Sequence, residues 1–120
     1  MNIEELRDYC LLVKGATESF PFDDTTLVFK VMDKMFAYTN IAHKDGTFKV
    51  NLKCDPVRSI ELREQYMGVT PGTHTRSLLW NSIYLDSDVP DPLIKALIDH
   101  SVEEVIKKLS KKKQVEYFNN

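Results

Sequence analysis

Lysine side chains at alternating positions of one predicted strand are the residues whose chemistry is easiest to interpret. In the segment from Phe48 to Leu52, apolar residues alternate with Lys49 and Asn51, and Lys53 continues the polar set. Successive side chains of a strand point to opposite faces of a sheet, so these lysines are expected on the solvent side, with Lys30 of an earlier strand. Ammonium groups arranged in this way contact phosphates as mobile point charges, which gives salt-sensitive binding with little sequence preference. The pattern predicts a face that binds the DNA backbone.

A loop in the second half of the chain supplies two more candidate phosphate contacts. Residues 69–76 contain Pro71 and Gly72, which indicates a loop with room for a short strand at its start. Arg76 would add a guanidinium, and the threonine hydroxyls beside His74 can donate to backbone oxygens of DNA. The predicted nucleic-acid-binding residues are Lys30, Lys49, Lys53, His74 and Arg76.

Exposed lysines also have an ordinary interpretation as solubility and edge-protection residues. The chain has 16 basic and 18 acidic residues, a net charge of −2, so its long-range attraction toward DNA is weak. The alternative prediction is a protein-interaction or homodimerisation module, in which a sheet edge binds an extended segment or a second copy. In that interpretation Tyr117 and Phe118 form a docking tail.

Patterns typical of enzymes, metal sites and cofactor sites are missing from the sequence. The three histidines lie far apart, and there is no HExxH, paired CxxC, glycine-rich phosphate loop or nucleophile-elbow motif. Asp86, Asp88 and Asp91 lack the glycine and terminal glutamate of a calcium loop, so turn and capping roles are predicted for them. We therefore predict a non-enzymatic protein without a metal ion or cofactor.

Length and composition predict one domain. With 120 residues, of which 42% are hydrophobic and 28% charged, the chain fits a single core over residues 1–120. No apolar run approaches the ~18 residues of a membrane span, and the first residues are acidic where a secretory signal is basic. Cys10 and Cys54 stand singly, which is typical of reduced thiols. These features predict a cytoplasmic protein.

Hydrophobic periodicity predicts a helix followed by three strands. Asn2 and Glu5 form a capping-box pair ahead of apolar residues at helical spacing, and Gly15 ends that helix. The period then changes to two, and the predicted strands cover residues 27–31, 35–41 and 48–53. Tight turns are predicted at Asp33-Lys34 and Asp45-Gly46. One face of these strands is expected to be apolar and the other solvated.

Two further helices are predicted in the second half of the chain. Asp55 is a helix N-cap followed by proline, and Val57 and Ile60 supply apolar positions of that helix. The segment 88–92 begins the longest helix, whose apolar stripe continues to Leu109. Five lysines occur between residues 107 and 113. The favoured interpretation is a solvated helix end whose cations complement the partial negative charge of the C-terminus, and functional use is the alternative.

Two strands complete the predicted sheet. One is the short strand at the start of the 69–76 loop, and the other covers 80–85, where Trp80 is expected to anchor the core or a sheet edge. The order is α-β-β-β-α-β-β-α. This order predicts an α+β fold with an antiparallel sheet and helices packed mainly on one face.

Several separate segments resemble the MmcQ/YjbR family in order and spacing. They are Phe20-Pro21-Phe22, Lys34-Met35-Phe36-Ala37, and residues 50–56, 68–72 and 80–86. The resemblance spans nearly the whole chain. It implies a secretion-chaperone-like α+β domain and a DNA-binding function through a double-wing motif, and it supplies no catalytic or cofactor residues. Ser87-Asp88 stands where a glycine is common in relatives, which makes that turn more acidic.

Overall fold

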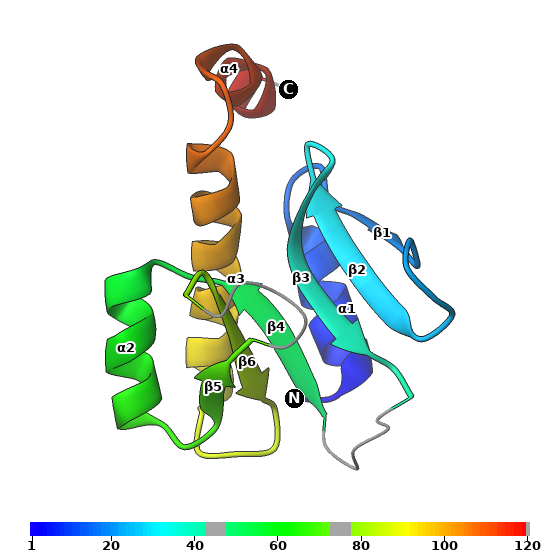
Figure 1. Cartoon of the computed structure of the whole chain (residues 1–120). Coiled ribbons are helices and arrows are strands. Elements are labelled where there is room, and N and C mark those ends of the chain that lie inside the picture. Colours follow the sequence, from blue (N-terminus) through cyan, green and yellow to red (C-terminus); the bar gives the residue numbers. More distant parts are fainter. Residues whose placement is uncertain (43–47, 73–77, 120) are drawn as a thin grey trace.

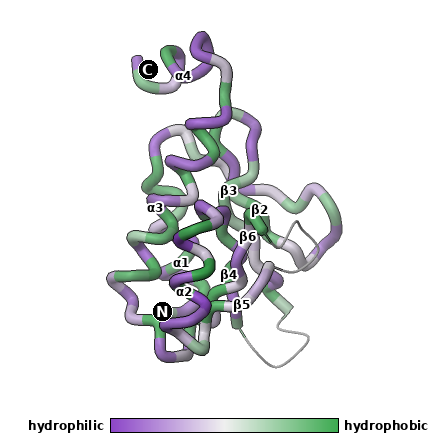
Figure 2. Tube along the Cα trace, turned by 60° about the vertical axis from the view of Figure 1, so that its left-hand side comes forward, coloured by the Kyte–Doolittle hydropathy of each residue, from purple (hydrophilic) through white to green (hydrophobic). Residues whose placement is uncertain are grey.

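The structure, a computed structural model, describes residues 1–42, 48–72 and 78–119. Within these residues, six strands form one antiparallel sheet in the order β1-β2-β3-β4-β6-β5 (Figure 1). Helices α1, α2 and α3 lie to one side of the strands (Figure 2). The predicted α+β fold is confirmed.

The elements follow the predicted order with two additions. In chain order they are α1 (Ile3–Leu12), β1 (Thr17–Ser19), β2 (Thr26–Val31), β3 (Lys34–Asn40), β4 (Lys49–Lys53), α2 (Pro56–Gln65), β5 (Val69–Pro71), β6 (Trp80–Tyr84), α3 (Asp91–Lys107) and α4 (Lys111–Asn119). The additions are β1 and α4. Strand β1 is only three residues long and has no buried residue, so it carries no hydrophobic alternation that a sequence pattern could detect.

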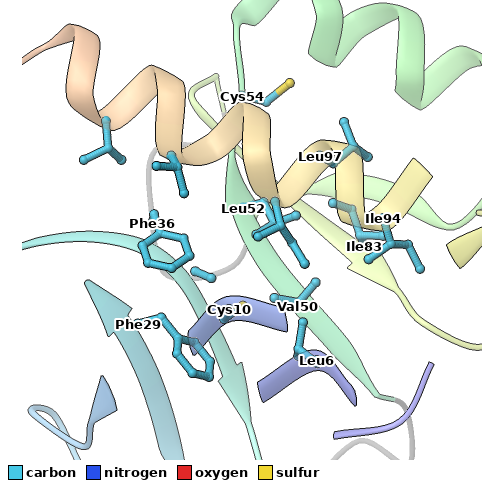
Figure 3. Close-up of a cluster of buried hydrophobic side chains, with 14 of the residues drawn as sticks. Leu6, Cys10, Phe29, Phe36, Val50, Leu52, Cys54, Ile83, Ile94 and Leu97 are labelled. Atoms are coloured by element: carbon cyan, nitrogen blue, oxygen red, sulfur yellow. The ribbon is translucent and has the colours of Figure 1, made fainter. Parts of the chain in front are cut away.

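The main core lies between the sheet and helices α1 and α3 (Figure 3). The side chains at its centre that are at most 1% exposed include Leu6, Cys10, Phe29, Phe36, Val50, Leu52, Ile83 and Ile94. Helix α2 contributes Leu62 to the same core. Burial of apolar surface is worth ~25 cal/mol per Å², so this cluster holds the sheet to its helices.

Strands β2 and β3 are joined by a two-residue turn at Met32 and Asp33. Both residues have positive φ angles, 50° and 63°. Positive φ at both central positions is typical of a type I′ turn, whose twist matches that of the flanking strands. The turn therefore lies one residue earlier than predicted, because Met32 is not a residue type that signals this backbone conformation.

A β-bulge in β3 is fastened by a serine of α3. Phe29 pairs with Ala37 and Lys30 pairs with Met35, which leaves Phe36 as the extra residue of the bulge. The Ser101 hydroxyl donates to the Phe36 carbonyl oxygen at 2.5 Å, and its oxygen accepts the Lys53 backbone N–H at 2.9 Å. One buried side chain thus joins α3 to β3 and to the end of β4.

The apolar positions of α2 that the sequence pattern indicates do not face the core. Asp55 caps this helix as predicted, but Val57 and Ile60 are 66% and 54% exposed. The helix buries Ser59 and Leu62 instead. The reason is a polar network that joins α2 to β6. Arg63 Nε donates a hydrogen bond to Asn81 Oδ1 at 2.8 Å, and Asn81 Nδ2 donates one to Ser59 Oγ at 3.1 Å.

The carboxylate of Asp88 stabilises the turn between α2 and β5. It accepts the backbone N–H groups of Met67 and Gly68, both at 2.8 Å, and these hydrogen bonds lower the pKa of Asp88. Its predicted turn role is confirmed. It does not cap α3, because Pro90 occupies that N-cap position without a side-chain hydrogen bond.

Candidate nucleic-acid interface

The sheet face opposite the main core is not the solvated surface that the sequence predicts. Val28, Tyr38 and Trp80 form a second buried cluster there, against which Met35 and Leu79 pack. The rings of Tyr38 and Trp80 lie 5.5 Å apart between centroids. The solvated-face prediction is therefore wrong, because bulky side chains of three strands gather at the centre of this face. The prediction that Trp80 is an anchor is confirmed.

Buried polar groups on this face separate two of the predicted lysines. Asn51 lies between Lys49 and Lys53 on β4, and its side-chain oxygen accepts the Ser82 hydroxyl at 2.6 Å. Both Asn51 and Ser82 are buried. Four residues of strand span about 13 Å, so Lys49 and Lys53 leave the sheet at opposite ends of β4.

Sheet register places Lys30 and Lys53 near one end and Lys49 at the other. Lys30 pairs with Met35 beside the β2–β3 turn, and Lys53 directly follows the pair of Ala37 with Leu52. Lys49 instead pairs with Tyr84, and its ammonium nitrogen lies 5.5 Å from the centroid of that ring. The structure therefore does not bring the three predicted lysines into one continuous stripe.

The ammonium group of Lys53 shares its surroundings with lysines of two other elements. Burial lowers the pKa of Lys53, and the positive charges of Lys108 and Lys34 lower it further, against the opposing effect of Glu104. These interactions link the β2–β3 turn, the end of β4 and the end of α3. Sequence spacing could not reveal this convergence, because the three lysines are separated by 19 and 55 residues along the chain.

The C-terminal lysines are divided between two helices. Lys107 ends α3 and Lys108 occupies its C-cap, as the helix-end interpretation predicts. The chain then turns, and Ser110 Oγ accepts the Lys113 backbone N–H at 3.3 Å at the start of α4. Lysines 111–113 therefore occupy a first helical turn, where the backbone carries partial positive charge. The helix-end interpretation is wrong for these three residues.

We name this cationic region the basic end and define it by segments 32–36, 52–54 and 104–116. Its lysines are Lys34, Lys53, Lys107, Lys108, Lys111, Lys112 and Lys113. The same segments hold Asp33, Glu104 and Glu116, and Glu104 pairs with Lys107 at 2.8 Å. Seven lysines and three acidic residues give this region +4, whereas the whole chain carries −2. Figure 1 shows the β2–β3 turn, the end of α3 and α4 at the same end of the molecule.

Comparison with known proteins agrees with this fold. The model of the family described as YjbR matches residues 11–103. The chain belongs to the YjbR family. It is 32% identical over 114 residues to the uncharacterized protein YjbR of Escherichia coli (strain K12), with 95% of each chain covered. It is also 30% identical over 95 residues to the uncharacterized protein YbdF of Escherichia coli O157:H7, covering 79% of this chain and 76% of that one.

Solved structures share the YjbR-family fold of this chain. Deinococcus radiodurans protein DR2400, a DUF419 domain, superposes with a TM-score of 0.87 at 37% identity, covering 97% of this chain and 87% of that one. A Pseudomonas syringae protein superposes with a TM-score of 0.73 at 23% identity, covering 84% and 96%. The second likeness concerns the fold alone.

Two predicted contact residues of this YjbR-family chain, His74 and Arg76, lie outside the described residues, as does the predicted Asp45-Gly46 turn. Their roles stay predictions. Among the described residues, no group of three or more His, Cys, Asp or Glu side chains could hold a metal ion, and no helix is long and apolar enough to cross a membrane.

The two thiols of the YjbR-family chain are free and buried. Burial raises the pKa of Cys10 to about 12 and also raises the pKa of Cys54. Because the thiolate is the reactive form, these shifts make both groups weak nucleophiles at neutral pH. Their positions in the core are those of small apolar side chains.

His100 of α3 joins this helix to the start of α2. Its Nε2 accepts the Asp55 backbone N–H at 3.1 Å, which requires a neutral ring protonated at Nδ1. Burial lowers the pKa of His100, and the nearby Arg58 lowers it further. Protonation of Nε2 would remove the acceptor of the Asp55 N–H. It would also bring the positive charge of the His100 ring close to that of Arg58.

This geometry predicts that the protein loses stability in mild acid. Since the pKa of His100 in the folded chain lies below its ordinary value of 6.5, the unfolded chain binds the proton more readily. The contribution of His100 to the free energy of unfolding is therefore complete above pH 6.5. This contribution is lost as the pH falls through the folded-state pKa. Thermal melts from pH 7.5 to 5 should show this fall. His100→Gln offers an acceptor at every pH and should flatten the profile; an unchanged profile would contradict this account.

Proposed function

We propose that this protein binds nucleic acid, double-stranded DNA in particular, through contacts of the basic end with the phosphate backbone. The observation that carries the proposal is the net charge of +4 on the basic end, to which the β2–β3 turn, the end of β4, the end of α3 and the start of α4 all contribute. Like charges gathered in this way repel one another, and a bound polyanion relieves that repulsion. The proposal agrees with the DNA-binding function that the family resemblance implies.

The start of α4 supports the same conclusion. Lysines 111–113 place cations beside the first backbone N–H groups of a helix, which themselves favour anions. Both features attract phosphate oxygens to one place. They also repel each other when no anion is present.

The proposal changes the set of expected contacts. Lys53 stays in it, and Lys30 lies near the same end of the sheet. Lys49 leaves it, because this lysine lies beside Tyr84 at the other end of β4. A basic end made of lysines that come from several elements favours sequence-tolerant binding over base recognition.

A matched pair of double variants tests the location of the contacts. Lys34→Glu with Lys108→Glu reverses two exposed charges of the basic end, and Lys49→Glu with Lys95→Glu makes the same net change elsewhere. Anisotropy of a labelled 20-base-pair duplex at 50 mM salt should show affinity at least about tenfold lower for the first variant, and within about threefold of the unmodified chain for the second. Equal losses in both variants, with melting temperatures unchanged, would refute the location.

A further inference from the structure

The outer face of α2 is an apolar stripe flanked by acidic side chains. Val57, Ile60, Glu61 and Glu64 follow the i, i+3, i+4, i+7 spacing of one helix face, and all four are exposed. Within the described part of the chain, neither glutamate forms an ion pair. This face carries Val57 and Ile60, the apolar positions that the sequence pattern indicates for the helix, and the structure leaves both outside the core.

The outer face of α4 has the opposite charge. Lys111, Val115 and Phe118 follow the i, i+4, i+7 spacing, and the two apolar side chains are 57% and 66% exposed. Figure 2 shows α4 beyond the end of the body, with hydrophobic and hydrophilic stretches along it. None of residues 111–119, all of which the structure describes, is buried.

The inner face of α4 holds it to the body through polar contacts. Gln114 Nε2 donates to the Leu109 carbonyl at 2.9 Å, and the Tyr117 hydroxyl donates to the Lys14 carbonyl at 2.9 Å. The Lys14 ammonium nitrogen also lies 5.5 Å from the centroid of the Tyr117 ring. These contacts turn Val115 and Phe118 away from the body.

We propose that two copies of the chain pair reciprocally, with the outer face of α4 in each copy packing on the outer face of α2 in the other. Val115 and Phe118 of one copy then cover Val57 and Ile60 of its partner. Lysines at the start of α4 meet Glu61 and Glu64, so both the apolar and the charged parts are complementary. This assembly goes beyond the proposed DNA binding. Because both use the lysines at the start of α4, a second copy and duplex DNA compete for these side chains.

The sheet edges favour helix pairing over strand pairing as the mode of association. Each edge strand is three residues long, and β5 ends in Pro71, which has no N–H to donate. A reciprocal arrangement closes with two equal contacts, whereas a one-way contact would build a larger ring or an open filament. Because α4 is about 14 Å long, each contact is small, and a weak, concentration-dependent dimer is expected.

Charge reversal in two separate variants tests the pairing without nucleic acid. One variant carries Glu61→Lys and Glu64→Lys, and the other carries Lys111→Glu and Lys112→Glu. Each alone places like charges at both contacts, so sedimentation should show the monomer at concentrations where the unmodified chain is dimeric. An equimolar mixture restores opposite charges at both contacts and should dimerise as the unmodified chain does. A control with Glu4→Lys and Asp24→Lys raises the net charge by four, as the first variant does, and should stay dimeric.

Three outcomes would overturn the inference. They are an unmodified chain that stays monomeric up to about 1 mM, reversed variants that dimerise as well as the control, and a mixture that stays monomeric although each variant melts at the normal temperature. Since assembly is measured without DNA, these outcomes are independent of the result for the basic end.

Discussion

Replacing Ser101 by alanine is expected to lower the free energy of unfolding by about 2 to 4 kcal/mol, because two backbone groups then lose their partner inside the protein. Ser101 is completely buried, and its hydroxyl serves the Phe36 carbonyl and the Lys53 N–H. A cavity too small for water would remain in its place. Urea denaturation, with the midpoint and the slope both measured, provides the value.

An exposed serine gives the matched control for this change. Ser19 lies in the edge strand β1 and is exposed, so Ser19→Ala should change stability by less than about 0.5 kcal/mol. Ser101→Ala should also weaken the proposed DNA binding slightly, since it loosens the end of β4 that carries Lys53. If Ser101→Ala proves as mild as Ser19→Ala, the bulge does not depend on α3.

Adding one methyl group at Gly68 is expected to destabilise the protein by about 1 to 3 kcal/mol. A Cβ there would lie 2.0 Å from Ser87 Oγ and 2.7 Å from Ser87 Cβ. The serine cannot turn away without loss, because its hydroxyl donates to the Tyr84 carbonyl at 2.6 Å. Thermal and urea denaturation of Gly68→Ala measure the effect.

Removing the opposing side chain should relieve the crowding at Gly68. In a Ser87→Gly background, the step from Gly68 to alanine should cost less by at least about 1 kcal/mol than in the unmodified chain. The remaining cost reflects Asp88, whose Oδ1 lies 3.1 Å from the added Cβ. Strict additivity of the two changes would show that the clash with Ser87 is not the cause.

Local signals predicted the element boundaries that depend on neighbours in the chain. The capping box of Asn2 with Glu5 and the N-cap at Asp55 are both present, because each is completed within one helical turn. The inward side of α2 was not predictable, since it is fixed by hydrogen bonds to Asn81 of a strand that follows later. The break before α4 carried one available signal, the N-cap residue Ser110 inside the lysine run.

The candidate site was predictable only in part. Strand alternation indicates correctly that Lys49 and Lys53 share the direction of Asn51, but it does not indicate that Asn51 is buried between them. Nor can it show that Lys34 and Lys108 approach Lys53, because that approach depends on the packing of α3 on β3 and β4. Pairwise sequence spacing carries no information about such contacts.

The salt dependence of duplex binding by the unmodified chain decides whether the basic end contacts the DNA backbone. If about four lysines of the basic end contact phosphates, the logarithm of the binding constant should fall with the logarithm of salt concentration with a slope near −3.6. Affinity would then drop about 150-fold between 50 and 200 mM salt, from a dissociation constant of about 1 µM. A slope near zero, or no binding below about 1 mM protein at 50 mM salt, would contradict the claim that the basic end binds the DNA backbone.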